Sequence, residues 1–515
     1  MIYPLTVQAE RLADKPAVID DGPDGTTLTW SYAELNRQAN RLAHVFRDLG
    51  LKPGERFIWC GPNSPAVVAV GHARAKVGAT AVPLNYRLTP EETAYIVDDS
   101  DAVLVYTDAE QADTFARIRA SMTRVRHVVV YGGSVPPGML DGDALVARAS
   151  TDEPPPAPME HPASMLYTSG TTGRPKGAVR QPLDPAAVVP LLRHIGFEQD
   201  DVYLTTGPLY HSGPGGFLQI AQLFGNTAVI QRKFDPADWL RLVQKYRVST
   251  TFSAPTPIRI VCNLPAAVKA RYDRSSMKRM IANAAPWSFA LKEQYLADFP
   301  EDSLWEIYGS TELGVDTVLA PKDQRRKPGS CGQAAPGVEI KLFDEAGREI
   351  TEANVPGEVY VRSANNFVDY HKANEKFTAN RRDDFLSVGD IAYRDAEDFY
   401  YICDRKSDMI ISGGMNVYPA EIEAALERHP GVQEVAVFGI PSDEWGEAVH
   451  AVVVPHPGQI LAPDVLMTFG REHLASYKVP RSISFVGELP KTGSGKVLKR
   501  ALREPFWRGR TTRVG

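Results

Sequence analysis

The sequence has few cysteines and no long apolar run. Its four cysteines, Cys60, Cys262, Cys331 and Cys403, lie far apart and form no Cys-x-x-Cys pair. This spacing excludes a disulfide framework and a cysteine zinc site, and it is typical of a reducing compartment. Charge, proline or glycine interrupts every apolar stretch within about ten residues, so no integral membrane segment is predicted. Residues 1–16 lack the basic start and apolar run of a secretion signal, and we expect a cytoplasmic protein.

The chain also lacks an excess of basic residues. Its formal net charge is −6 at pH 7, so no basic surface for nucleic-acid binding is predicted. With 515 residues, of which 43% are hydrophobic and 23% charged, the chain is an ordinary globular sequence that can bury a large core. At this length we expect roughly two to four domains.

Residues 50–260 alternate short β-rich runs with helical patterns. The predicted strands are residues 56–60, 102–106, 127–131, 202–206 and 250–253, and the predicted helices include residues 90–97 and 236–246. Asp235 followed by Pro236 is a typical helix start, with a capping side chain before a proline in the first turn. The alternation predicts an α/β fold with a largely parallel sheet. The Pro-rich residues 150–163 are interpreted as a loop within one large domain.

The pattern changes twice in the last third of the chain. After Gly329, residues 338–343, 357–362 and 399–403 predict a small antiparallel unit. From Ser407 onward, a helix near residue 419, strands at 432–440 and 448–454, and a helix at 463–474 predict a compact α+β unit. We therefore expect a large N-terminal α/β domain over residues 1–404, a hinge at 405–408 and a small C-terminal α+β domain over 409–515.

The most informative segment is TSGTTGRPKG, residues 168–177, which follows a predicted strand at 164–167. Its glycines allow a tight turn that points backbone N–H groups at an anion. Hydroxyls and one lysine add further donors. The segment departs from the Walker pattern because proline precedes the lysine and glycine follows it. It predicts a cradle for a triphosphate, made by Thr168, Ser169, Gly170, Thr171, Thr172, Gly173 and Lys176.

This segment and six others, in the same order, resemble the adenylate-forming superfamily, which includes acyl-CoA synthetases. The other six are LTWSYAELN (28–36), AKVGATAVPLNYRLTPEE (75–92), YGSTE (308–312), SVGDIAY (387–393), DRKSDMIISGGMNVYPAEIE (404–423) and PKTGSGKVLKRALRE (490–504). The resemblance implies a large domain with a small mobile one. It also implies ATP, Mg²⁺ and CoA as cofactors, formation of acyl-AMP, and displacement of AMP by a thiol.

The resemblance also assigns the nucleotide site. Glu312 and Thr168 are expected to bind Mg²⁺, which usually takes only one or two protein carboxylates. Asp390 is expected to accept the ribose hydroxyls, with Arg405 opposite. Tyr308 is expected to stack on adenine against Ala284, Ala285 and Pro286. Gly309, Ser310 and Thr311 complete the predicted nucleotide site.

The remaining assignments concern catalysis and the thiol. Lys496 is expected to contact the carboxylate and the α-phosphate, and His211 to lie beside the substrate carboxylate. Ser412, Gly413 and Gly414 are expected to line the CoA channel. Ser407 occupies the hinge position, where many relatives carry Asp or Lys. Asp398 stands where a turn glycine is usual, and Asp tolerates the left-handed conformation better than most residues.

The substrate is predicted to be a hydrophobic carboxylic acid, either fatty, alicyclic or aryl. No Asp or Glu occurs between Tyr203 and Ile230, where relatives that activate amino acids hold the ammonium group. Gly213 and Gly216, beside several apolar residues, predict a roomy pocket. The alternative is an adenylating enzyme that hands acyl-AMP to a partner ligase or carrier protein. A non-catalytic nucleotide-binding scaffold is disfavoured because Lys176, Glu312, Asp390, Arg405 and Lys496 are all present. A homodimer is left open.

Overall fold

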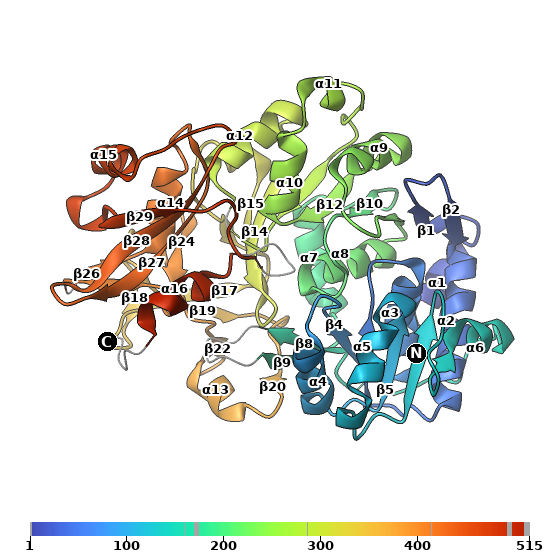
Figure 1. Cartoon of the computed structure of the whole chain (residues 1–515). Helices are drawn as coiled ribbons and strands as arrows, with labels where there is room; N and C mark the ends of the chain where they lie inside the picture. The colour runs from blue at the N-terminus through green and yellow to red at the C-terminus, as the bar shows by residue number, and fades with distance from the viewer. Residues whose placement is uncertain are drawn as a thin grey trace.

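The computed structural model describes residues 3–158, 160–168, 175–285, 287–413, 415–491 and 497–508. It is a mixed α/β protein with a large N-terminal part and a smaller unit at residues 410–508, here called the C-terminal lobe. Figure 1 shows the lobe in orange and red at one side of the molecule and the blue N-terminal region at the other. The fold class predicted from the sequence is confirmed.

The first sheet has eight strands in the order β20-β9-β8-β4-β3-β5-β6-β7. These strands are β3 (Arg56–Cys60), β4 (Thr80–Leu84), β5 (Leu104–Asp108), β6 (His127–Tyr131), β7 (Leu140–Asp141), β8 (Ser164–Thr168), β9 (Lys176–Arg180) and β20 (Asp369–Tyr370). The pairs from β8 through β7 are parallel, whereas β9 runs antiparallel to β8 and to β20. The predicted strand at 102–106 begins two residues later in the structure, at Leu104.

The connections in this sheet begin where the sequence offers caps. Helix α3 (Pro65–Val77) follows Ser64, and α4 (Pro90–Asp99) follows Thr89, whose side chain forms a reciprocal capping box with Glu92. Each helix has proline in its first turn, where no N–H is needed. The other helices of this half are α1 (Pro4–Arg11), α2 (Tyr32–Asp48), α5 (Ala112–Arg117) and α6 (Gly142–Arg148).

The second sheet has nine strands in the order β16-β15-β14-β13-β12-β10-β11-β1-β2. They are β1 (Pro16–Asp21), β2 (Thr27–Ser31), β10 (Val202–Thr205), β11 (Thr227–Ile230), β12 (Thr250–Ser253), β13 (Arg279–Ala282), β14 (Leu304–Ser310), β15 (Gly314–Leu319) and β16 (Gln333–Ala334). Its central strands are parallel, as predicted. The helices along this part of the chain are α7 (Pro185–His194), α8 (Ser212–Leu223), α9 (Pro236–Tyr246), α10 (Pro255–Cys262), α11 (Ala266–Lys269) and α12 (Phe289–Asp298).

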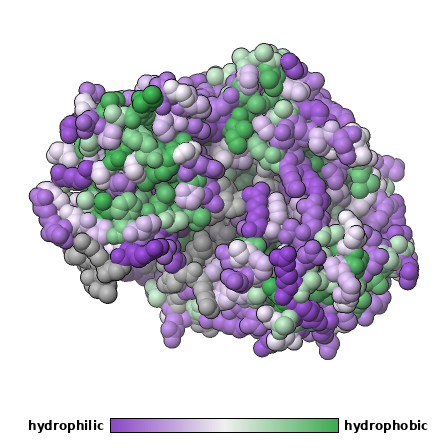
Figure 2. All heavy atoms as spheres, viewed as in Figure 1, coloured by the Kyte–Doolittle hydropathy of each residue, from purple (hydrophilic) through white to green (hydrophobic). Residues whose placement is uncertain are grey.

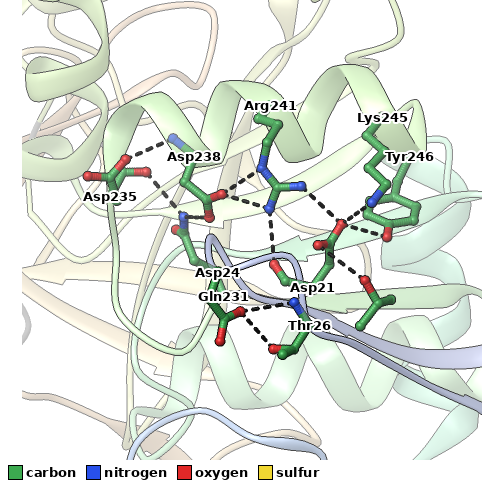
Figure 3. A network of polar contacts seen from close by, with 10 residues as sticks. Asp21, Asp24, Thr26, Gln231, Asp235, Asp238, Arg241, Lys245 and Tyr246 are labelled. Carbon is green, nitrogen blue, oxygen red and sulfur yellow. Dashed lines mark hydrogen bonds and ion pairs between the residues drawn. The ribbon is translucent and has the colours of Figure 1, made fainter.

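A polar network ties the edge hairpin β1–β2 to helix α9 (Figure 3). Asp21, at the end of β1 and only 3% exposed, accepts hydrogen bonds from Lys245 Nζ at 2.6 Å and Tyr246 Oη at 2.7 Å. Arg241 Nη1 donates to the same carboxylate at 3.0 Å. The side chain of Asp235 caps α9 by accepting from the Asp238 N–H, as the sequence predicts. This network fixes the first strand of the chain onto a helix more than 200 positions later.

The third sheet is antiparallel and follows residue 335, as predicted. It comprises β17 (Glu339–Phe343), β18 (Glu349–Ile350), β19 (Gly357–Arg362), β21 (Arg381–Arg382), β22 (Phe385–Leu386), β23 (Asp390–Arg394) and β24 (Tyr400–Arg405). A short helix, α13 (Asn374–Ala379), lies beside it in the sequence. Asp398 adopts φ 61° in the turn before β24, so the prediction that this residue imitates a turn glycine is confirmed.

The C-terminal lobe has a five-stranded sheet with three helices. Its elements are β25 (Ile410–Ser412), β26 (Met415–Val417), α14 (Pro419–Leu426), β27 (Val432–Ser442), β28 (Gly446–Pro455), α15 (Pro463–His473), β29 (Ser482–Phe485) and α16 (Lys499–Trp507). Figure 2 shows apolar side chains gathered on the face of this lobe. No helix among the described residues is long and apolar enough to cross a membrane.

Candidate active site

The β14–β15 hairpin carries most of the YGSTE motif. Tyr308 pairs with Thr317, and the register then shifts so that Gly309 lies opposite Val315. A side chain on Gly309 would place its Cβ 1.9 Å from the carbonyl oxygen of Gly314, so no other residue fits there without moving the backbone. The hairpin therefore holds Tyr308 and Glu312 in a fixed relation to each other.

The two ends of the predicted phosphate loop meet across β8 and β9. Thr168 ends β8, Lys176 begins β9, and the two residues are direct partners in the antiparallel register. This pairing places Thr168 and Lys176 side by side where β8 ends and β9 begins, at the two ends of the predicted phosphate loop. The predicted phosphate ligands between them, Ser169, Gly170, Thr171, Thr172 and Gly173, lie outside the described residues.

Glu312 is the acid at the centre of the site. It is 8% exposed, and its Oε1 accepts a hydrogen bond from Thr168 Oγ1 at 2.9 Å and from Tyr370 Oη at 3.1 Å. Among the described residues no group of three or more His, Cys, Asp or Glu side chains could hold a metal by itself. A single carboxylate with a neighbouring hydroxyl nevertheless fits Mg²⁺, which keeps several waters and shares its coordination with substrate phosphates.

Asp390 forms the second polar centre, at the start of β23. Its Oδ2 accepts from Tyr308 Oη at 2.6 Å, and Arg405 Nε lies 3.5 Å from its Oδ1. Burial and the nearby Asp390 charge raise the pKa of Tyr308 well above its usual value, so the phenol stays a proton donor. The structure thus brings together Tyr308, Asp390 and Arg405, three residues predicted to bind one nucleoside.

The predicted adenine wall begins directly after β13. Ala284 has φ 72°, an uncommon conformation for a residue with a side chain. The preceding Asn283 donates from Nδ2 to the Ile307 carbonyl oxygen at 2.8 Å, which ties this turn to the strand that carries Tyr308. Ala285 is half-buried beside it, and Pro286 lies outside the described residues.

Helix α8 approaches the hairpin through its first residue. Ser212 Oγ and Thr311 Oγ1 are 2.9 Å apart, and His211, the residue before the helix, packs its ring on Tyr210 with centroids 4.4 Å apart. The two pocket glycines differ. A Cβ on Gly213 would overlap the Phe252 ring at 2.3 Å, whereas a Cβ on Gly216 would meet nothing within 4 Å. Gly213 therefore serves close packing, and Gly216 borders open space.

The residues predicted for the thiol lie in the C-terminal lobe. Ser412 is buried and pairs with Gly446 and Met415, while the Gly413 N–H donates to the Trp445 carbonyl oxygen at 2.8 Å. Each of these hydrogen-bond partners belongs to the lobe itself. Gly414 and Lys496 lie outside the described residues.

The predicted hinge residue Ser407 lies between residues that contact the large part and residues that contact the lobe. Before it, the Lys406 N–H donates to the Gly389 carbonyl oxygen at 2.7 Å, in the large part. After it, Asp408 Oδ1 lies 3.9 Å from Arg503 Nη1, in the lobe. The predicted domain limits at 404 and 409 remain predictions.

Three residues near the site were not predicted from the sequence. Tyr370, which hydrogen-bonds Glu312, lies outside the seven segments that carry the family resemblance. Arg180 is paired with the carbonyl oxygens of Thr311 and Asn365, and a basic residue on the strand after the phosphate loop was the available signal. Asp316 is fully buried, and neither of its carboxylate oxygens has a partner among the described residues. Nothing in a single sequence distinguishes it from a surface acid.

Comparison with protein families decides the assignment. The family described as AMP-binding enzyme matches residues 5–371, and the AMP-binding enzyme C-terminal domain matches residues 421–496. The chain belongs to the AMP-binding enzyme family. It is an ATP-dependent, AMP-forming acid–thiol ligase, an enzyme class that works with ATP, Mg²⁺ and CoA.

Relatives of this AMP-binding enzyme match along nearly the whole chain. A feruloyl-CoA synthase from an Amycolatopsis species is 34% identical over 97% of this chain and 98% of its own. A fatty acid–[acyl-carrier-protein] ligase, ScoC from Streptomyces coeruleorubidus, is 34% identical over 98% and 96%. The crystal structure of ATP-bound MatB from Rhodopseudomonas palustris is 30% identical over 98% and 99%, with a TM-score of 0.86.

Proposed function

We propose that this enzyme joins a hydrophobic carboxylic acid, either fatty, alicyclic or aryl, to AMP and then transfers the acyl group to CoA. The observation that carries the proposal is the convergence of two polar centres on one hairpin. Tyr308 is bonded to Asp390, a carboxylate suited to ribose hydroxyls, and four positions later Glu312 is bonded to Thr168 at the end of the phosphate loop. This arrangement suits a nucleoside triphosphate better than any ligand without both a sugar and phosphates.

The chemistry explains why the site holds cations and donors and needs no base for its first step. A carboxylic acid of pKa about 4 to 5 is already ionised at pH 7, so the barrier is the approach of two anions. Its oxygen attacks the α-phosphorus while the bond to pyrophosphate breaks. Lys176 and Lys496 would lower the repulsion, and Glu312 with Thr168 would hold Mg²⁺, which when bound neutralises phosphate charge. CoA sulfur, after losing its proton to solvent, then attacks the acyl carbon; the bond from that carbon to the phosphate oxygen breaks, and AMP leaves with the electron pair.

The apolar surroundings of α8 support a hydrophobic acid. The buried Phe217 and Phe252 rings stack with centroids 5.4 Å apart, and Phe217 directly follows Gly216, which borders open space. Helix α8 contains no charged residue that could hold an ammonium group. Feruloyl and fatty acyl groups, named for the two relatives above, are both of the proposed kind.

The second candidate is transfer of the acyl group to a carrier protein or partner ligase. Two observations favour it: Ser407 departs from the usual hinge residue, and one 34% identical relative is a ligase for an acyl carrier protein. The cytoplasmic location and a homodimer stay predictions that no comparison tests.

The test is a panel of carboxylic acids assayed in two stages. With ATP and Mg²⁺, exchange of labelled pyrophosphate into ATP should occur with a hydrophobic acid and not with an α-amino acid. With CoA added, mass spectrometry should find the acyl thioester. Exchange without thioester would favour the carrier-protein alternative. No exchange with any fatty, alicyclic or aryl acid would overturn the proposal.

A further inference from the structure

An arginine of the large part reaches across to the C-terminal lobe. Arg259 lies on α10, the helix that begins directly after β12 ends. Its Nη1 donates to the Gln433 carbonyl oxygen at 3.1 Å and lies 3.4 Å from Glu434 Oε1. Its Nη2 lies 3.9 Å from Glu427 Oε1. All three partners belong to the lobe, and the Arg259 side chain is only 19% exposed.

Glu434 holds a second cation at the same time. Lys491 Nζ donates to both of its carboxylate oxygens, at 2.7 and 2.9 Å. The exposed fractions are 13% for Glu434 and 19% for Lys491, so water screens this pair less than a surface pair. Without Glu434, Arg259 and Lys491 would be two like charges held close together. Lys491 is also five positions before Lys496, the lysine predicted to act in acyl-AMP formation.

A contact close to the hinge differs in kind. Asp404 Oδ2 accepts from the Ala420 N–H at 3.0 Å, three positions before the predicted hinge residue Ser407. A contact next to a hinge can survive a rotation about it. Arg259 lies on α10, which is not part of the predicted hinge at residues 405–408. A rotation of the lobe about that hinge must therefore break the Arg259 contacts.

We propose that Glu434 and Arg259 are positioning residues for acyl-AMP formation. They hold the lobe in the orientation seen here, and they must separate before thioester formation. Ser412 and Gly413, which are predicted to serve the thiol, have their hydrogen-bond partners within the lobe in this orientation, which agrees with the assignment. The inference rests on the proposed function and adds a device that sets the balance between its two half-reactions.

The experiment measures the half-reactions separately in Glu434→Gln and Arg259→Met, with an acid that the wild-type enzyme accepts. Coupling between sites typically amounts to 5- to 150-fold, and we expect acid-dependent pyrophosphate exchange to fall about 10-fold. Thioester formation from supplied acyl-AMP and CoA should stay within about twofold of wild type or rise. The double variant should lose no more than either single one, because both substitutions break the same contact.

Glu421→Gln is the matched control. Glu421 accepts from Lys478 Nζ with both oxygens at 2.7 Å, as Glu434 does from Lys491, but among the described residues no ion pair joins Glu421 to the large part. Neither half-reaction should change in this variant. Equal losses in both half-reactions, or unchanged exchange, in the Glu434 and Arg259 variants would overturn the inference. A wild-type enzyme without exchange would instead overturn the proposed function.

Discussion

Two buried acids of the large part differ in what surrounds them. Asp21, in the network that fastens β1 to α9, accepts hydrogen bonds from Arg241, Lys245 and Tyr246 (Figure 3). Asp316, on the hairpin that carries Tyr308 and Glu312, is 0% exposed, and neither carboxylate oxygen has a partner in the part of the chain that the structure describes.

Their pKa values move in opposite directions. Burial alone would raise the pKa of Asp21, but the hydrogen bonds from Lys245, Tyr246 and Arg241 lower it to about 2. Burial raises the pKa of Asp316 well above its usual value, and the charge of Asp390 adds to this, whereas Arg180 opposes it. The buried charge of Asp21 is therefore compensated by its neighbours, whereas Asp316 accepts no hydrogen bond from the described residues. Perturbed, uncompensated groups cluster where proteins bind and react.

The largest effect is expected from Glu312→Gln, which should break catalysis and leave the fold intact. Removing this charge takes away the predicted metal ligand, and a lost electrostatic contact of this kind costs about 100- to 1,000-fold in rate. Pyrophosphate exchange would measure the loss, and thermal unfolding should match wild type. Activity above about a tenth of wild type would show that Glu312 is not the metal ligand.

Asp21→Asn should lower the stability of the fold and leave catalysis intact. Breaking a buried pair is strongly destabilising, and because Arg241 and Lys245 keep partial contact with water we expect a loss of about 2–3 kcal/mol in the free energy of unfolding. Urea unfolding measures this loss, and activity per folded molecule should be unchanged. Asp24→Asn is the control from the same network, since Asp24 is exposed and, among the described residues, its side chain bonds Thr26 alone. A similar loss in both variants would contradict the comparison.

The pH dependence of stability gives a second test of the role of Asp21. Its pKa is lower in the folded chain than in the unfolded chain, so its contribution is present above the unfolded value of 3.8 and is lost as pH falls toward about 2. The shift corresponds to about 2 kcal/mol. Comparing wild type with Asp21→Asn, the stability difference should shrink steadily below pH 4. A difference that stays constant down to pH 2 would contradict this assignment.

The smallest effect is expected from Asp316→Asn, which should raise the free energy of unfolding, whereas Asp21→Asn lowers it. Because the folded chain holds the proton more tightly, wild-type stability falls as pH rises above the unfolded pKa of 3.8. An amide removes this cost, so at pH 7 the variant should gain about 1 kcal/mol in urea unfolding. The gain should vanish below about pH 4. A less stable variant at pH 7 would mean that the carboxylate has a stabilising partner.

Local chemistry made much of the fold predictable. The predicted strands 56–60, 127–131 and 250–253 coincide with β3, β6 and β12, and the start of α9 follows from Asp235 and Pro236. Strands β5 and β24 begin later than predicted because the β-rich composition starts before the first residue that pairs. Strand β1 was not predicted, since its order depends on pairing with β11, which is distant in the sequence.

The site was less predictable from residues alone. Thr168 and Glu312 are 144 positions apart, and only the resemblance to a family joined them. The hydrogen bond from Tyr370 to Glu312 depends on the pairing of β20 with β9, which no local pattern reveals. Gly213 was assigned to a pocket because glycine leaves room, but here the room is filled by Phe252.

The close approach of Gly309 to the Gly314 carbonyl oxygen limits how the substrate range of this enzyme could be altered in the laboratory. Any side chain there would collide with the Gly314 carbonyl, and a displaced backbone would shift Tyr308 relative to Glu312. Mutant libraries that include this position would consist mostly of inactive clones, whatever acid they are screened against. Diversity is better directed to α8 around Gly216, where an added methyl group meets open space.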